Sequence, residues 1–191
     1  KLAEDLAHDT QRLTELLNSQ GPWDADRDHK WQALHKLLTQ THGKDKVLIF
    51  TQFADTARYL AREARKAGIS HVALATGASA DPYDIACRFS PKSNNKSVSK
   101  ADEVRVLICT DVLSEGQNLQ DSNVVVNFDL PWAIIRLIQR AGRVDRIGQR
   151  AEEIHCYSFL PADGVEQLIQ LRSRIRQRLK ENAEVVGTDE A

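Results

Sequence analysis

One segment of the chain combines residue types and a spacing that suit phosphate chemistry. Residues 139–149 read Gln-Arg-Ala-Gly-Arg-Val-Asp-Arg-Ile-Gly-Gln, so Arg143 and Arg146 stand three residues apart, just past Gly142 and near the end of a predicted helix. A guanidinium group is planar and permanently charged, and it can donate paired hydrogen bonds to phosphate oxygens and stabilise the charge that develops in phosphoryl transfer. This spacing therefore indicates nucleoside triphosphate chemistry. The alternative is that these basic residues only complement a helix dipole or form weak surface ion pairs.

A second polar segment, residues 110–120, lies between two apolar runs. It follows residues 104–109 and leads into residues 124–128, and both runs are typical of buried parallel strands. In open α/β sheets, ligands bind beyond the carboxyl ends of the strands, where backbone N–H groups are free to contact phosphates. The segment is therefore a candidate binding loop, although an ordinary strand-to-helix connection would have the same composition.

Strand patterns alternate with helix patterns from Lys46 onward. The predicted strands are residues 47–50, 71–75, 104–109, 124–128 and 154–159, and the predicted helices are residues 54–66, 82–89 and 132–142. Such alternation indicates βαβ crossovers, so we expect an α/β fold with a parallel sheet of five or more strands flanked by helices. Residues 90–103 lack periodicity and are rich in Ser, Asn and Lys, which predicts a mobile loop.

Helical patterns also flank this alternating region. Leucines recur at helical spacing in residues 1–19, which predicts an amphipathic helix that stops at Gly21 and Pro22. A second helix is predicted for residues 28–41, with Asp28 as its cap. Beyond residue 163, apolar residues again follow one helical face and arginines surround the rest, which predicts a C-terminal helix that packs on a partner.

The bulk properties are those of a globular domain. Of 191 residues, 41% are hydrophobic and 28% are charged, which is enough to bury one substantial core. No apolar stretch suits a membrane span and the first residues do not form a signal peptide, so we expect a cytoplasmic location, nucleoid-associated if the protein is bacterial. The formal net charge is −1, so we expect weak DNA binding that depends on a few local phosphate contacts.

No metal site is predicted within the chain. Cys87, Cys109 and Cys156 are widely separated and resemble reduced, buried, small apolar residues. The histidines form no pair at helical spacing, and those near the N-terminus are predicted to lie on a helix surface: His29, His35 and His42.

With these segments in view, the chain resembles the second RecA-like lobe of superfamily two helicases, and specifically the Swi/Snf-like branch of DNA translocases. The likeness covers most of the chain. Residues 46–53 resemble motif IV, residues 75–79 the Gly-Ser segment after the next strand, residues 110–119 motif V and residues 139–149 motif VI. All four occur in the expected order, each at the end of a predicted strand or helix.

Two details of sequence bear on the branch within that family. The ending Arg-Ile-Gly-Gln, residues 146–149, favours the Swi/Snf-like branch over the RNA helicases. Many family members have Trp-Asn-Pro before motif VI, whereas residues 129–134 here read Asp-Leu-Pro-Trp-Ala-Ile. That departure is more similar to a bacterial subgroup than to a chromatin remodeller.

The resemblance implies a division of the chain and a role for each part. Residues 1–42 would be a helical extension from the first lobe, residues 43–162 the RecA-like lobe, and residues 163–191 a C-terminal amphipathic helix and tail. ATP would bind in the cleft between two lobes. The partners would be that first lobe and a nucleic acid, most simply duplex DNA.

The resemblance also implies individual site residues. Arg143 and Arg146 would be arginine fingers for the β and γ phosphates, and Gln139 would order their helix or contact the γ-phosphate or the attacking water. Gly116, with Glu115 nearby, would approach the ribose or bridge the two sites. The expected DNA-backbone contacts come from the strand ends: Thr110 and, more weakly, Gln52, Thr76 and Gly77. For the weaker ones, a purely local role in a turn or strand end is the alternative.

Elements that ATP hydrolysis needs are missing from this sequence. It contains no Gly-x-x-x-x-Gly-Lys-Ser/Thr loop and no Asp-Glu-x-His box, so the Walker elements and the Mg²⁺ ligands are expected on a first lobe outside this chain. The chain alone should therefore be inactive. With that lobe, we expect translocation along duplex DNA. The alternatives are a lobe of a strand-separating RNA or DNA helicase and a non-catalytic docking lobe.

Overall fold

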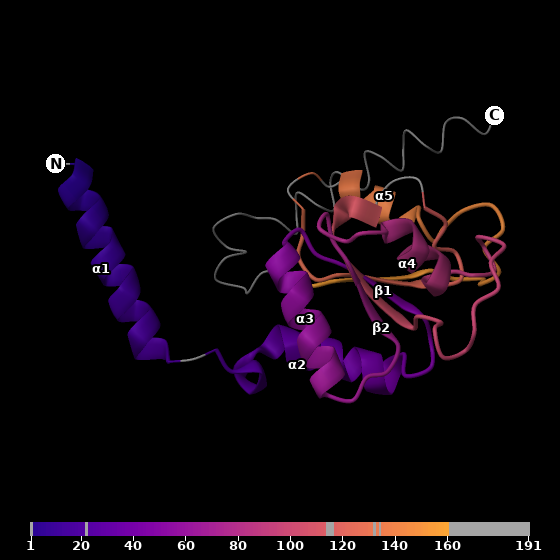
Figure 1. Ribbon diagram of the computed structural model, residues 1–191, viewed down its shortest axis with the longest axis horizontal. Coiled ribbons are helices and arrows are strands. Elements are labelled where there is room, and N and C mark those ends of the chain that lie inside the picture. The colour runs from indigo at the N-terminus through magenta and orange to yellow at the C-terminus, as the bar shows by residue number, and fades with distance from the viewer. Residues whose placement is uncertain (1, 22, 114–116, 132, 134, 161–191) are drawn as a thin grey trace.

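The computed structural model describes residues 2–21, 23–113, 117–131, 133 and 135–160. Within them the chain forms one parallel sheet of five strands in the order β2-β3-β1-β4-β5 (Figure 1). The strands are β1 Val47–Phe50, β2 Val72–Ala75, β3 Val106–Cys109, β4 Val124–Asn127 and β5 His155–Ser158. The predicted α/β fold with a parallel sheet of five or more strands is thus confirmed.

Helices cover both faces of the sheet. α2 (His29–Lys36) and α3 (Ala54–Lys66) lie on one face, and α4 (Pro82–Phe89) and α5 (Ile135–Ala141) lie on the other (Figure 1). The three central strands are buried along their whole length, which explains their continuous apolar sequences. Two apolar cores result, one on each face.

The alternation of patterns predicted the central elements well. β1, α3 and α4 have the predicted bounds, and the remaining strands are shorter than predicted by one or two residues. The predicted helix at residues 28–41 is in fact α2 followed by a π-helical turn, Leu37–Thr41. Asp28 does cap α2, because its side chain accepts hydrogen bonds from Lys30 N and Trp31 N at 3.0 and 3.1 Å. Two short 3₁₀ turns complete the described elements: Ala25–Arg27 and Asp111–Leu113.

The N-terminal helix extends away from the sheet. α1 runs from Leu2 to Gln20 and ends at Gly21, whose φ of 69° is one that glycine adopts readily (Figure 1). Its predicted amphipathic pattern is present, and the leucines of that stripe are exposed. The predicted C-terminal helix, residues 163–191, lies outside the described residues. None of the described helices is long and apolar enough to span a membrane.

Two expectations about individual residues were wrong. His42 is buried rather than on a helix surface, because Asp45 and Tyr157 bind its two ring nitrogens at 2.8 and 2.9 Å. Cys156 is exposed, since β5 is an edge strand. Cys109 is buried as expected, and burial raises the pKa of its thiol well above the ordinary value.

The predicted mobile loop is also corrected in part. Residues 90–103 contain no helix or strand, as expected. Residues 90–96, however, form a closed turn in which Lys96 N donates to Pro91 O at 2.8 Å. Asp121, far away in sequence, accepts hydrogen bonds from the backbone of Lys92 and Ser93 at 2.8 and 2.9 Å. This turn is therefore anchored to the lobe.

Asp28 makes a second contact that leads to a pH prediction. Its carboxylate accepts a hydrogen bond from the Tyr59 hydroxyl at 2.9 Å, which joins the start of α2 to α3. Burial, helped by that carboxylate, raises the pKa of Tyr59 from 10 to about 12. The fold thus favours the neutral phenol. We expect this contribution to stability to be complete below pH 10 and to be lost as the pH rises toward 12.

The measurement is the free energy of unfolding as a function of alkaline pH, for the wild type and for Tyr59→Phe. The Phe variant should lack this part of the pH dependence because it has no hydroxyl to ionise. A folded protein in which the phenolate absorbance of Tyr59 appears at an ordinary pKa would contradict the prediction.

Candidate nucleotide and nucleic-acid site

The parallel topology gathers the predicted nucleic-acid contacts at one edge of the sheet. Phe50 pairs with Cys109 and with Asn127, and Ala75 also pairs with Cys109, so these four strands end side by side. The residues that follow them therefore share the carboxyl edge: Gln52, Thr76, Gly77 and Thr110. This is the edge where ligands of open α/β sheets bind.

These four residues differ in how available they are. The Gln52 side chain already donates to Leu130 O at 3.0 Å, and its backbone N–H donates to the Asp129 carboxylate at 2.9 Å. Thr76 is buried, and its hydroxyl accepts from Ala78 N at 3.3 Å. Gly77 is exposed and Thr110 is half-buried. Gly77 and Thr110 are therefore the more accessible members of the set.

The two arginines lie in the turn after α5 rather than on it. The helix ends at Ala141, and Val144 N and Asp145 N both donate to Ala141 O at 3.0 Å. Arg143 is half-buried and Arg146 is exposed. We call residues 142–149 the arginine loop. Gln139 lies before it on the exposed side of α5.

The end of the second polar segment, residues 118–120, holds the arginine loop in place. Leu119 N donates to Arg143 O at 3.3 Å, and Gln120 Nε2 donates to Ile147 O at 3.2 Å. Arg146 Nη1 donates to the Asn118 side-chain oxygen at 3.1 Å. Motifs V and VI are thus bonded to each other through both backbone and side chains.

Gln149 closes the far end of the arginine loop. Its Nε2 donates to Val144 O and Ser122 O at 2.9 and 3.0 Å, and its Oε1 accepts from the backbone of Arg150 and Ala151 at 2.8 and 2.9 Å. Both protons and both lone pairs of this amide are thus used within the fold. The last residue of the Arg-Ile-Gly-Gln ending therefore has a structural role.

Arg140 differs from the two arginines of the arginine loop because it is fully buried and bonded within the lobe, and the sequence analysis did not single it out. It is 0% exposed, its Nε donates to Asp111 Oδ1 at 2.8 Å, and its Nη1 donates to Asn127 Oδ1 at 3.0 Å. Its guanidinium also lies 5.1 Å from the centre of the Phe50 ring. Arg140 thereby joins α5 to the carboxyl ends of three strands. Arg136 reinforces this pair, since its Nη1 donates to Asp111 Oδ2 at 2.7 Å.

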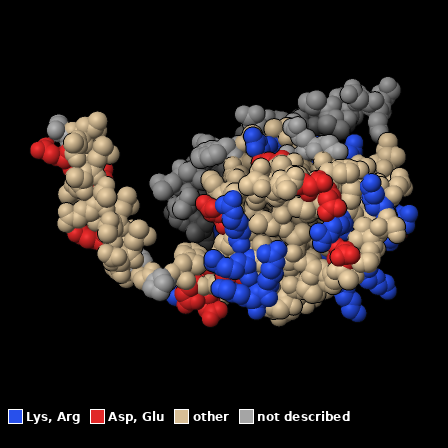
Figure 2. Space-filling view, in the orientation of Figure 1, with Lys and Arg blue, Asp and Glu red and all other residues tan. Residues whose placement is uncertain are grey.

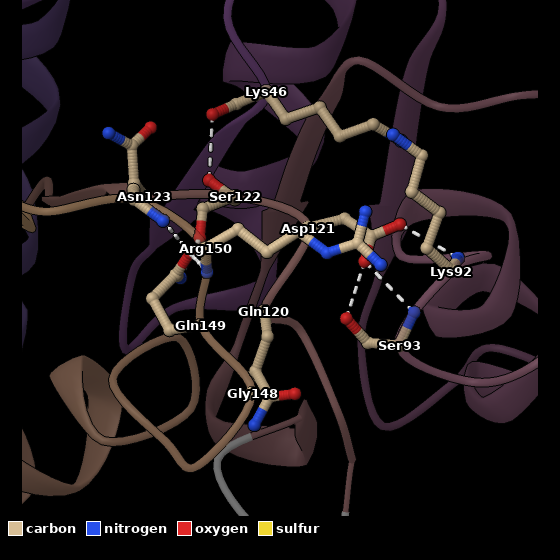
Figure 3. A pocket seen from close by; sticks show the side chains of 11 residues that line it. Lys46, Lys92, Ser93, Gln120, Asp121, Ser122, Asn123, Gly148, Gln149 and Arg150 are labelled. Atoms are coloured by element: carbon tan, nitrogen blue, oxygen red, sulfur yellow. Dashed lines mark hydrogen bonds between the residues drawn. The ribbon is translucent and has the colours of Figure 1, made fainter.

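A hollow of about 460 Å³ lies beside the end of the arginine loop, at the amino ends of β1 and β4 (Figure 3). Its polar groups mostly bond to other parts of the protein. The Ser122 hydroxyl donates to Lys46 O at 2.7 Å, and Lys46 Nζ lies 2.7 Å from the Glu103 carboxylate. We therefore regard the hollow as part of the loop's support.

Basic side chains also gather over α3 (Figure 2). Most of these cations already have partners. Arg58 pairs with Asp55 at 2.6 Å, and the carboxylate of Glu63 binds Arg62 and Lys66 at 2.8 and 3.1 Å. These bonds lower the pKa of Glu63, most through Arg62. The α3 surface is thus internally ion-paired rather than a free track for phosphates.

Two expected site residues, Gly116 and Glu115, lie outside the described residues. The described residues offer cations that suit phosphates, but they contain no group of three His, Cys, Asp or Glu side chains that could hold a metal ion.

A family model described as the helicase conserved C-terminal domain matches residues 29–148. The uncharacterized ATP-dependent helicase YqhH of Bacillus subtilis (strain 168) is 36% identical over 125 residues, which make up 65% of this chain and 20% of YqhH. The RNA polymerase-associated protein RapA of Vibrio vulnificus (strain YJ016) is 36% identical over 135 residues, 70% of this chain and 13% of RapA. The chain thus corresponds to a small part of these relatives.

Solved structures support the fold. The C-terminal part of the Fun30 ATPase domain matches with a TM-score of 0.62 at 20% identity, over 87% of this chain and 52% of that one. A DEAD box protein from Methanococcus jannaschii matches with a TM-score of 0.57 at 23% identity, over 78% of this chain and 37% of that one. At these identities the likeness establishes the RecA-like fold alone.

Proposed function

The chain belongs to the helicase conserved C-terminal domain family, and from that premise we propose that it is the C-terminal motor lobe of an ATP-dependent, DNA-stimulated translocase. Its likeness to YqhH and RapA supports an assignment to the Swi/Snf-like ATP-dependent helicases, and its likeness to the Fun30 ATPase domain supports the RecA-like fold. In this proposal the lobe supplies arginines and DNA-backbone contacts, and a first lobe completes the ATP site.

The arginine loop is the feature that carries the proposal. It holds Arg143 and Arg146 on a turn that is bonded at several points to the segment after β3, while Arg146 stays exposed. Two guanidinium groups at this spacing can bind the β and γ phosphates and offset the charge of the transition state. They would do so when the cleft closes.

Other site residues are assigned by the same reasoning. We propose that Gln139 helps to order the γ-phosphate or the attacking water, and that Gly116, with Glu115 nearby, lets the backbone approach the ribose. ATP would enter as its Mg²⁺ complex, and the metal ligands would come from the first lobe. Bound Mg²⁺ would neutralise phosphate charge there.

The carboxyl edge of the sheet is the proposed DNA surface. Thr110 would donate its hydroxyl to a backbone phosphate, and Gly77 would offer its exposed N–H group. Gln52 and Thr76 would contribute mainly by shaping the same edge, since both side chains are already bonded within the lobe. Contacts limited to the backbone are consistent with a motor that moves along DNA without reading its sequence.

The proposed division of the chain follows the same scheme. Residues 1–42 would connect to the first lobe, residues 43–162 would be the motor lobe, and residues 163–191 would be a C-terminal amphipathic helix and tail. ATP binding favours a closed arrangement of the lobes, and hydrolysis releases it, so differential affinity for DNA in the two states produces steps. A cytoplasmic, nucleoid-associated location would follow if the substrate is bacterial DNA.

The proposal is tested by ATP turnover of the full-length protein without nucleic acid and with single-stranded DNA, duplex DNA or RNA. We expect duplex DNA to stimulate most, and the present chain alone to show no turnover. If RNA or single strands stimulate best, the alternative of a strand-separating helicase replaces the translocase. If no nucleic acid has an effect, the lobe is a docking or regulatory module.

A further inference from the structure

We propose that the turn formed by residues 90–96, which we call the buttress turn, positions Arg146, and that Asn118 is the positioning residue between them. This inference rests on the role proposed above for Arg146. It extends the site to a part of the chain that no sequence motif includes. The inference is based on a continuous path of hydrogen bonds from the buttress turn to the guanidinium group of Arg146.

Asn118 connects the two parts through three hydrogen bonds. Its Nδ2 donates to Ser93 O at 3.4 Å, and its backbone oxygen accepts from Asn94 Nδ2 at 2.8 Å. Because the amide nitrogen is directed to a carbonyl of the buttress turn, the amide oxygen is left to accept from Arg146 Nη1, at 3.1 Å. The orientation of the Asn118 side chain, and with it that of Arg146, thus depends on the turn.

Asp121 anchors the buttress turn itself. Its two carboxylate oxygens accept from the backbone N–H groups of Lys92 and Ser93 at 2.8 and 2.9 Å, and one of them also accepts from the Ser93 hydroxyl (Figure 3). Hydrogen bonds to a carboxylate are stronger than those between neutral groups. Asp121 is therefore the point at which the position of the turn is set.

The need for such support follows from the exposure of Arg146. A long side chain on a solvent-exposed loop has many rotamers, and ordering it costs conformational entropy. A bond that orders the guanidinium before ATP arrives removes part of that cost from the catalytic step. Weakening the support should therefore lower kcat more than it changes KM for ATP.

The test is ATP turnover of the full-length protein with saturating duplex DNA, using Asn118→Ala and Asp121→Ala. We expect kcat to fall about tenfold to a hundredfold in each, with KM for ATP changed less than about threefold. Asp102→Ala is the matched control, because Asp102 lies on the same connection and its carboxylate binds only the exposed Ser99 hydroxyl, at 2.7 Å, among the described residues. This control should behave as the wild type.

A double-mutant cycle separates positioning from a general structural role. If Asn118 acts through Arg146, then Asn118→Ala should cause little further loss in an Arg146→Ala background, measured in single-turnover reactions. Losses that add fully would overturn the inference, as would wild-type kcat in both Asn118→Ala and Asp121→Ala. Should Asp121→Ala fail to fold, Ser93→Ala replaces it, since it removes only one hydroxyl bond.

The same experiment distinguishes this inference from the proposed function. If Arg146→Ala alone keeps wild-type turnover, the finger role of Arg146 is wrong and the buttress has nothing to position. If Arg146→Ala abolishes turnover but Asn118→Ala and Asp121→Ala do not, the proposed function stands and only the buttress role is rejected.

Discussion

Replacing Arg143 or Arg146 by alanine is expected to lower kcat for ATP hydrolysis by the full-length protein by at least about a thousandfold, the lower end of what arginine fingers contribute. The reason is that each guanidinium would stabilise charge that is greatest in the transition state. KM for ATP should change much less than kcat. The measurement is steady-state turnover at saturating duplex DNA.

Arg150→Ala is the matched control for both variants. It removes an exposed arginine from the residue next to the arginine loop, and no contact of its guanidinium ties it to that loop among the described residues. It should keep the wild-type kcat. If Arg143→Ala and Arg146→Ala both retain turnover within about tenfold of the wild type, neither residue is an arginine finger.

Asp111→Ala is expected to lower the free energy of unfolding of this chain by about 3 to 5 kcal/mol, because it leaves a buried cation without its carboxylate. The cation is Arg140, whose side chain is 0% exposed and which Asp111 binds at 2.8 Å. The change also removes the partner of Arg136. Urea unfolding followed by circular dichroism would measure the loss.

The control for this prediction is an ion pair of similar geometry at the surface. Asp55→Ala breaks the pair with Arg58 at 2.6 Å, in which the Asp55 side chain is 96% exposed. Exposed pairs contribute little because water solvates both partners well, so the unfolding midpoint should not change. Equal effects of Asp111→Ala and Asp55→Ala would show that burial of Arg140 does not determine stability at this site.

The elements that could be predicted are those specified by local sequence. α3 has its predicted bounds because its apolar residues follow one helical face, and β1 because four apolar residues stand between polar ones. The sequence also predicted that Thr110 and Gln52 lie at the same edge of the sheet, since the carboxyl ends of neighbouring parallel strands lie side by side. The end of α5 was not predicted from the sequence, because the chain after Ala141 closes a turn onto the segment after β3.

The features that were missed depend on residues far apart in the sequence. His42 is buried by Tyr157, 115 positions away, and nothing in its helical neighbourhood indicates that contact. The buttress turn is fixed by Asp121, 28 positions after Ser93. A Ser- and Asn-rich composition indicates a loop, but it does not indicate what the loop is bonded to.

Arg140 illustrates the same limit within the candidate site. Residues 140–146 contain three arginines, and composition alone does not distinguish their roles. Only the position of α5 over the strand ends separates them, because it directs Arg140 to Asp111 and Asn127 and leaves Arg146 exposed. Residue type indicated the chemistry of the segment, and tertiary structure distinguishes a buried arginine that bonds within the lobe from more exposed ones.

The most direct test of the central claim is a structure of the full-length protein with duplex DNA, Mg²⁺ and ADP–aluminium fluoride, which mimics the phosphoryl group in transfer. We predict that the guanidinium groups of Arg143 and Arg146 lie within hydrogen-bond distance of the phosphate oxygens or of the fluoride atoms. A closed complex in which both arginines point away from the nucleotide, with other cations in their place, would contradict the account.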